Sequence, residues 1–145
     1  MKGEASKTIL VTGATAGIGR YVALDLAERG HRVFATGRNA KALAMLEAEA
    51  TKRGVGLSTV VLDVTDTNSI EAAKVVVRRA TEGRGIDVLV NNAGNSYLGN
   101  FEELTNADIE RQMTTNFYGV VNVLRAALPI LRKQRSGHII NVSSE

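Results

Sequence analysis

The sequence predicts an α/β fold in which helices cover both faces of one doubly wound parallel sheet. Short apolar runs alternate with segments of helical periodicity along all 145 residues, a pattern typical of βαβ units. No internal repeat, low-complexity segment or linker interrupts this alternation. The length fits one ordinary domain. We therefore expect residues 1–145 to form a single domain of five strands and four helices.

Five segments have the length and the apolar composition of buried strands. They comprise residues 7–12, 31–36, 56–63, 86–92 and 137–143. Crossovers between parallel strands are right-handed, and ligands of such sheets bind beyond the carboxyl ends of the strands, near the point where the strand order reverses. Functional motifs are therefore expected at these strand ends.

The four helices are predicted from apolar residues that recur every three or four positions. The recurring sets are Ile18, Val22 and Leu26; Leu43, Leu46 and Ala50; Ile70, Ala73, Val77 and Ala80; and Ile109, Met113, Phe117, Val121, Leu124, Leu128 and Leu131. The last helix is the longest, from about Thr105 to Gln134. Thr105 and Asp108 form a capping-box pattern, Asp66 is a candidate N-cap of the third helix, and Pro129 should bend the fourth.

The composition is that of a globular protein with few special chemical groups. Hydrophobic residues make up 44% of the chain and charged residues 23%, close to the averages of folded domains. The sequence has no cysteine, which excludes disulfides and thiolate ligands, and we predict no metal site. No apolar run near the N-terminus is long enough for a signal peptide or a membrane span, so we expect a cytoplasmic protein without membrane partners. The net charge of +3 is spread along the chain, which argues against nucleic-acid binding.

A glycine-rich turn joins the first predicted strand to the first predicted helix. Its candidate cofactor-binding residues are Gly13, Thr15, Ala16, Gly17, Ile18 and Gly19. Such a turn presents free backbone N–H groups at the positive end of the helix dipole, where a pyrophosphate binds. Gly13 would permit the tight turn, Gly17 the approach of a dinucleotide, and Gly19 close packing of the helix on the strand. The sequence thus predicts a Rossmann-type nucleotide site, with an ordinary glycine turn as the alternative.

The end of the second predicted strand indicates which dinucleotide is bound. NAD sites place an acidic residue about 20 residues beyond the glycine turn, whereas NADP sites use a basic one. This chain has Gly37 and Arg38 there, and the guanidinium of Arg38 suits the oxygens of a 2′-phosphate. We therefore predict NADP(H) as the cofactor. The alternative is that Arg38 is a solvated residue that opens the next helix.

The spacing of the turn, TGATAGIG, resembles that of the short-chain dehydrogenase/reductase family. Four further segments resemble this family in the expected order: LDVTD, NNAG at residues 91–94, TTNFYG and GHIINVSSE. Together they cover nearly the whole chain. The resemblance implies an NADP(H)-dependent oxidoreductase that interconverts an alcohol and a carbonyl by hydride transfer. Many NADP-using relatives carry a second basic residue just before the middle glycine, where this chain has Ala16.

The resemblance assigns five further positions to the cofactor: Asp63, Val64, Asn92, Ala93 and Gly94. Asp63 would accept a hydrogen bond from the adenine amine, beside the backbone of Val64; its alternative role is to cap the loop before the third helix. The backbone of residues 92–94 would lie along the adenosine ribose, where small residues are needed. Asn91 and Asn92 could equally tie the central strands together through their side-chain amides.

The resemblance also implies catalytic roles for Asn116 and Ser144. Asn116 lies inside the apolar-faced fourth helix, where an asparagine competes for backbone hydrogen bonds. The family pattern implies a helix distortion there that holds a water in a proton relay, and a plain surface position is the alternative. Ser144 would reach the substrate carbonyl from the end of the fifth strand, and Ser143 would point away.

A Tyr-x-x-x-Lys pair, which the resemblance implies for proton transfer, is not found in this sequence. Four residues after its three tyrosines, Tyr21, Tyr97 and Tyr118, stand Asp25, Phe101 and Asn122. We therefore expect a fragment of a longer protein, with a parent that is a homo-oligomer and an exposed sheet edge prone to self-association. A non-catalytic nucleotide-binding or regulatory module is the alternative function. The presence of both Asn116 and Ser144 favours the enzyme, whose small alcohol or carbonyl substrate the sequence does not identify.

Overall fold

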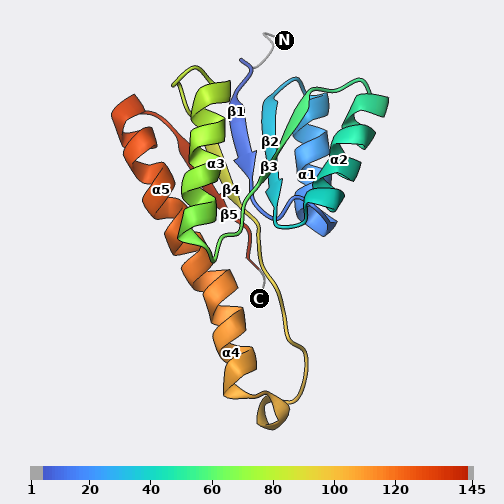
Figure 1. Cartoon of the computed structure of the whole chain (residues 1–145), viewed down its shortest axis with the longest axis vertical. Coiled ribbons are helices and arrows are strands. Elements are labelled where there is room, and N and C mark those ends of the chain that lie inside the picture. Colours follow the sequence, from blue (N-terminus) through green and yellow to red (C-terminus); the bar gives the residue numbers. More distant parts are fainter. Residues whose placement is uncertain (1–4, 144–145) are drawn as a thin grey trace.

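A computed structural model describes residues 5–143 of the chain. It contains one sheet of five parallel strands in the order β3-β2-β1-β4-β5 (Figure 1). The strands are β1 (Thr8–Val11), β2 (Arg32–Gly37), β3 (Leu57–Val61), β4 (Val88–Asn91) and β5 (His138–Asn141). The predicted doubly wound fold is confirmed, and the strand order reverses between β1 and β4.

Most of the strands are shorter than the predicted segments, by one or two residues at each end. Beyond β1, β3 and β5, residues 12, 62 and 142 each keep one backbone hydrogen bond to the neighbouring strand. Thr12 donates to the Val90 carbonyl at 3.0 Å, for example. The chain then leaves the sheet to enter the loops at the carboxyl edge. Apolar composition continues past the last ladder pair, so sequence alone overestimates the strand length.

Helices α1 (Gly17–Glu28), α2 (Ala40–Lys52) and α3 (Thr67–Ala80) are present as predicted. The predicted apolar faces of α2 and α3 are buried, apart from Ala80. The predicted face of α1 is wrong, because Ala23, Leu24 and Ala27 are buried there while Ile18 is 64% exposed. Asp66 caps α3, since its Oδ1 accepts from the amides of Asn68 at 2.9 Å and Ser69 at 3.4 Å. Asn39 caps α2 in the same manner by accepting from the Ala42 amide at 3.0 Å. The first of these caps was predicted and is confirmed.

The predicted fourth helix is present but has three parts, and its predicted apolar face is wrong except at Leu131. Val123, Ala127 and Leu131 are buried, whereas the predicted residues Ile109, Met113, Phe117 and Leu128 are exposed. A short 3-10 helix, η1 (Phe101–Glu103), precedes α4 (Asn106–Met113), which continues through one π-helical segment, η2 (Thr114–Tyr118), into α5 (Gly119–Gln134). The capping box at Thr105 and Asp108 is confirmed, and the hydrogen bond from the Thr105 hydroxyl lowers the pKa of Asp108. Pro129 lies within α5. Helix α4 projects past the carboxyl edge of the sheet (Figure 1).

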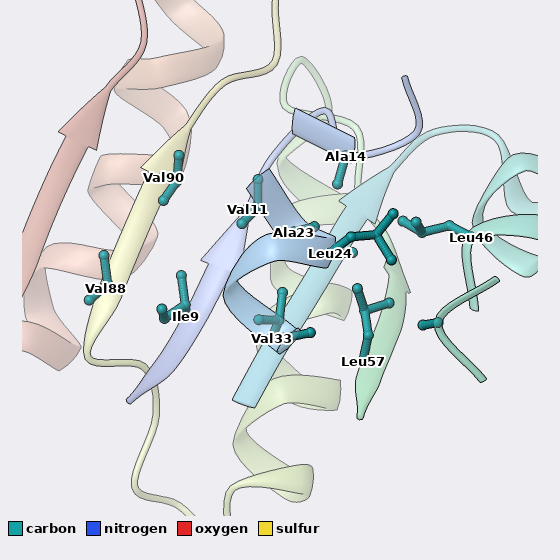
Figure 2. Packing of buried hydrophobic residues seen from close by; sticks show 13 residues of the cluster. Ile9, Val11, Ala14, Ala23, Leu24, Val33, Leu46, Leu57, Val88 and Val90 are labelled. Atoms are coloured by element: carbon teal, nitrogen blue, oxygen red, sulfur yellow. The ribbon is translucent and has the colours of Figure 1, made fainter. Parts of the chain in front are cut away.

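Successive residues of each strand point to opposite faces of the sheet, and each face has its own core. Ile9 and Val11 pack with residues of α1 and α2, such as Leu24 and Leu46 (Figure 2). Leu10 belongs to the second cluster, which α3 and α5 complete with side chains that include Ile70, Ala73, Val77, Val123, Ala127 and Leu131. The sheet therefore lies between two helical layers. The packed sheet supports the glycine turn and the loops that follow the strands.

Strand β5 lies at one edge of the sheet, with β4 as its neighbour among the described residues. Its four residues are all exposed, and Ile140 is 50% exposed. The predicted unpaired edge beside the fifth strand is thus present in residues 5–143. In the same part of the chain, no helix is long and apolar enough to cross a bilayer.

Candidate nucleotide-binding site

The glycine turn lies at the carboxyl edge of the sheet, beside the point where the strand order reverses. Gly13 and Gly17 adopt left-handed backbone angles, with φ of 64° and 53°. A Cβ at Gly13 would lie 2.7 Å from the Ala93 Cα, and a Cβ at Gly19 would collide with the Gly13 carbonyl and the Asn92 amide. These two glycines let the turn pack against the end of β4.

Gly17 has a different surrounding. Nothing lies within 4 Å of the position that a Cβ would take there, so the absence of a side chain is not required by protein packing. The space opens at the first residue of α1. A glycine that is free of protein neighbours at a helix N-terminus leaves room for a ligand to reach the backbone.

The N-terminus of α1 has no capping side chain. Its N-cap residue is Ala16, and no side chain accepts from the first amides of this helix. Helices α2, α3 and α4 are instead capped by Asn39, Asp66 and Thr105. Because the first N–H groups of a helix have no partner within it, those of α1 are available to an anion. The sequence predicts free donors at residues 16–19, and their contact with a phosphate stays a prediction.

The NNAG segment is tied to the glycine turn by side-chain hydrogen bonds. The Asn92 amide donates to the carbonyls of Thr12 and Gly13, both at 3.1 Å. The Thr12 hydroxyl accepts from the backbone amides of Asn92 and Ala93, both at 3.0 Å. The Asn92 side chain therefore has the structural role considered for it, since it ties the end of β4 to the end of β1. Sequence reasoning missed the part played by Thr12, whose only signal is its place at the end of β1.

Asn91 likewise joins two strands. Its buried side-chain amide donates to Asn141 Oδ1 at 2.9 Å, which links β4 to β5. Gly94 stands close to Asn116, because a Cβ at Gly94 would lie 3.2 Å from Asn116 Oδ1. The backbone of residues 92–94 is thus held near the switch point, and its contact with a ribose stays a prediction.

Asp63 and Val64 lie in the loop between β3 and α3. Asp63 Oδ1 accepts from the amide and the hydroxyl of Thr65, at 2.9 and 2.7 Å. Asp63 thus caps the loop through Oδ1, which is the alternative role considered for it. Within residues 5–143, its Oδ2 forms no hydrogen bond. Val64 is buried against Gly119 of α5, and its carbonyl accepts from the Asn122 amide at 3.2 Å. The loop is therefore anchored while one oxygen of Asp63 faces no protein donor among the described residues.

Arg38 immediately follows β2 and is exposed. It precedes Asn39, the N-cap of α2, and forms no ion pair or side-chain hydrogen bond with any residue from 5 to 143. Gly37 is buried, and a Cβ there would lie 2.6 Å from Thr15 Cγ2. A side chain at position 37 would therefore displace Thr15.

Asn116 lies in the π-helical segment, which confirms the helix distortion implied by the sequence. Its Oδ1 accepts from the Asn95 amide and its Nδ2 donates to the Asn95 carbonyl, both at 2.8 Å. π-Helical segments occur frequently at functional sites. The side chain fixes the backbone that follows NNAG, a contact that the sequence does not reveal. The proton-relay water stays a prediction, and Ser144 lies outside the described residues.

Replacing Asn116 by alanine should loosen the segment after NNAG. The change removes two hydrogen bonds to Asn95, each with a net contribution of about 0.5–1.5 kcal/mol. The Asn95 amide itself loses one of these two bonds, so its hydrogen exchange, followed by NMR, should accelerate about threefold to tenfold. Asn122→Ala is the matched control, since that amide contacts the Val64 carbonyl instead. Unchanged exchange at Asn95, or equal acceleration in both variants, would contradict the assigned contact.

Within residues 5–143, no group of three or more histidine, aspartate or glutamate side chains is placed to hold a metal ion. The carboxyl edge instead combines the uncapped amides of α1, the open space at Gly17 and the exposed Arg38. This donor set fits the phosphates of a dinucleotide.

The chain belongs to the short-chain dehydrogenase family, whose model matches residues 7–145. It is 41% identical over 137 residues to 3-ketodihydrosphingosine reductase of Bacteroides thetaiotaomicron, with 94% of this chain and 46% of that protein covered. It is 35% identical to NADPH-dependent pterin aldehyde reductase of Arabidopsis thaliana, covering 97% of this chain and 57% of the relative.

Solved structures agree with this assignment. The crystal structure of an actinorhodin polyketide ketoreductase variant with NADPH has a TM-score of 0.89 and 34% sequence identity, and the match covers 96% of this chain and 53% of that one. The chain therefore spans about half the length of the relatives that it matches. The predicted family and Rossmann-type fold are both confirmed.

Proposed function

We propose that this chain binds NADP(H) at the carboxyl edge of its sheet and that the whole protein interconverts an alcohol and a carbonyl. The observation that carries the proposal is the N-terminus of α1, which has no side-chain cap and faces the open space at Gly17. Relatives support the chemistry, since the names of three of them describe the reduction of a keto or aldehyde compound. An NADPH-dependent relative and an NADPH-bound structure support the choice of cofactor.

Four groups of residues would share the binding of the dinucleotide. The amides of residues 16–19 would hold the pyrophosphate, and Arg38 would pair with the 2′-phosphate through charge-assisted hydrogen bonds. Asp63 Oδ2 would accept from the adenine amine, while the backbone of residues 92–94 would line the adenosine ribose. Gly37, on which Thr15 packs, brings no carboxylate beside Arg38.

The reaction would take place beyond the ends of β4 and β5. When bound, the cofactor would supply or accept the hydride. Ser144 would donate a hydrogen bond to the substrate oxygen, and Asn116 would hold Asn95 and the adjoining backbone in place. Proton transfer requires a positioned acid or base, which the family pattern expects from a Tyr-x-x-x-Lys pair that the 145 residues do not contain.

Changing Arg38 to alanine should weaken NADPH binding by about 1.5–3 kcal/mol, the scale of a lost hydrogen bond to a charged group. NADH binding should change little because NADH lacks the 2′-phosphate. Calorimetric titration of both cofactors into wild-type and variant chains measures the two affinities. Arg132→Ala, which removes an exposed charge near the end of α5, is the control. Equal wild-type affinity for the two cofactors, or an unchanged preference in the Arg38 variant, would contradict the proposed 2′-phosphate contact.

A further inference from the structure

A second hollow lies between α3 and α5, apart from the nucleotide site. Its volume is about 840 Å³, within the range of small-molecule sites. Buried side chains form its floor, among them Leu10 and Leu89 of the sheet and Val77 and Val123 of the two helices. This hollow, here called the α3/α5 groove, is therefore an apolar trough of ligand size.

The rim of the α3/α5 groove is strongly cationic. Lys74 and Arg78 stand four residues apart on α3, and Arg125 and Lys133 stand eight apart on α5, so each pair forms a ridge along its helix. Arg84 adds a fifth cation from the loop after α3. The two ridges face the same trough. Their positive charges repel each other, and an anion bound between them would offset this repulsion.

Few acidic groups balance these cations. Asp87 lines the α3/α5 groove, but its Oδ2 accepts from the Thr8 amide at 2.7 Å. Glu71 pairs with Lys74 at 2.7 Å. The other four rim cations form no ion pair with the described residues 5–143. The rim thus keeps an excess of positive charge beside an apolar floor.

We propose that the α3/α5 groove binds a single-chain anionic amphiphile, such as a fatty acid. The alkyl chain would lie on the apolar floor, where its burial is favourable. The carboxylate would accept hydrogen bonds from the rim guanidinium and ammonium groups, of which arginine can bind both oxygens at once. A purely acidic partner would leave the floor unfilled, and an uncharged one would leave the ridges unneutralised.

This site would be separate from that of the cofactor. The groove is lined by Gly85, Ile86 and Asp87, which precede β4, and by Ser136, which precedes β5. These residues belong to the amino edge of the parallel sheet, whereas the glycine turn lies at the carboxyl edge. The apolar floor also reaches Leu62, which follows β3 at the carboxyl edge, but the rim cations Arg84 and Lys133 lie toward the amino edge. Occupancy of one site should therefore not exclude occupancy of the other.

Titration of dodecanoate below its micellar concentration into the 145-residue chain tests the proposal. The double variant Arg78→Gln with Lys133→Gln should weaken binding about tenfold or more, since it removes two charged donors from the rim. The matched control, Arg79→Gln with Arg132→Gln, removes the same charge from neighbouring positions on the same helices that do not line the groove. The control should bind dodecanoate as the wild-type chain does.

Two further titrations separate the chemistry and the site. Dodecanol and a glutamate-rich peptide should each bind far more weakly than dodecanoate, and NADPH should not displace dodecanoate. Absence of dodecanoate binding, equal losses in the two double variants, equal binding of the peptide, or displacement by NADPH would overturn the proposal. Because the readout uses no cofactor, a failure of NADPH binding would leave this result interpretable.

Discussion

Replacing Gly17 by valine is expected to abolish NADPH binding while the chain stays folded. The new side chain would enter the open space at the N-terminus of α1, which the pyrophosphate needs. The left-handed φ of 53° adds backbone strain, of order 1–3 kcal/mol. A domain of this size has a total stability of about 5–15 kcal/mol, so most molecules should remain native.

Gly54→Val supplies the control for that strain. Gly54 has φ of 70° and, like Gly17, no atom within 4 Å of a Cβ. It precedes β3 at the opposite edge of the sheet. Both variants should lose similar thermal stability, measured by circular dichroism, but only Gly17→Val should lose calorimetric binding of NADPH. A folded Gly17 variant that binds NADPH normally would show that the turn is not the phosphate site.

The 145 residues alone are expected to show no dehydrogenase or reductase turnover. A positioned acid or base typically contributes about 10²- to 10⁴-fold to the rate, and this sequence has no Tyr-x-x-x-Lys pair to supply it. Imperfect placement of the reacting atoms can cost about 10²-fold more. The unpaired edge at β5 should also promote self-association, because exposed strand edges pair with other strands.

NADPH oxidation with a panel of aldehydes, ketones and quinones measures this activity, and size-exclusion chromatography reports the association state. If the reading frame continues beyond residue 145, the longer chain is the positive control. Turnover at an ordinary enzymatic rate by a verified 145-residue chain would contradict the role assigned to the absent pair. Turnover by neither chain would favour the non-catalytic binding module instead.

The layered fold was predictable because its signal is local. The two-residue period of a strand is enough to predict that Ile9 and Val11 face one core and Leu10 the other. The start of the helical pattern is enough to predict that Asp66 caps α3. The π-helical segment could be predicted only from the family resemblance, because the apolar pattern of residues 109–131 shows no break there in the sequence. Strand ends were overestimated because composition does not show where backbone pairing stops.

The candidate site was predictable in its positions but not in its contacts. The spacing of Gly13, Gly17 and Gly19 indicated their different surroundings correctly. The bonds from Asn92 to Thr12 and from Asn116 to Asn95 join residues 80 and 21 positions apart, so they depend on how the strands and helices are assembled. The packing of Thr15 on Gly37 is of the same kind. Sequence patterns identify the residue types, while the fold decides which of them meet.

The location of NADPH on the chain is tested most directly by NMR chemical-shift mapping with an isotope-labelled chain. NADPH should shift the amides of residues 13–19, 38, 63–64 and 92–94, all at the carboxyl edge of the sheet. The amides of Gly30, Gly54 and Gly85, at the opposite edge, should stay in place. Saturable shifts confined to the amino edge, or no shifts at millimolar NADPH, would contradict the proposed nucleotide site.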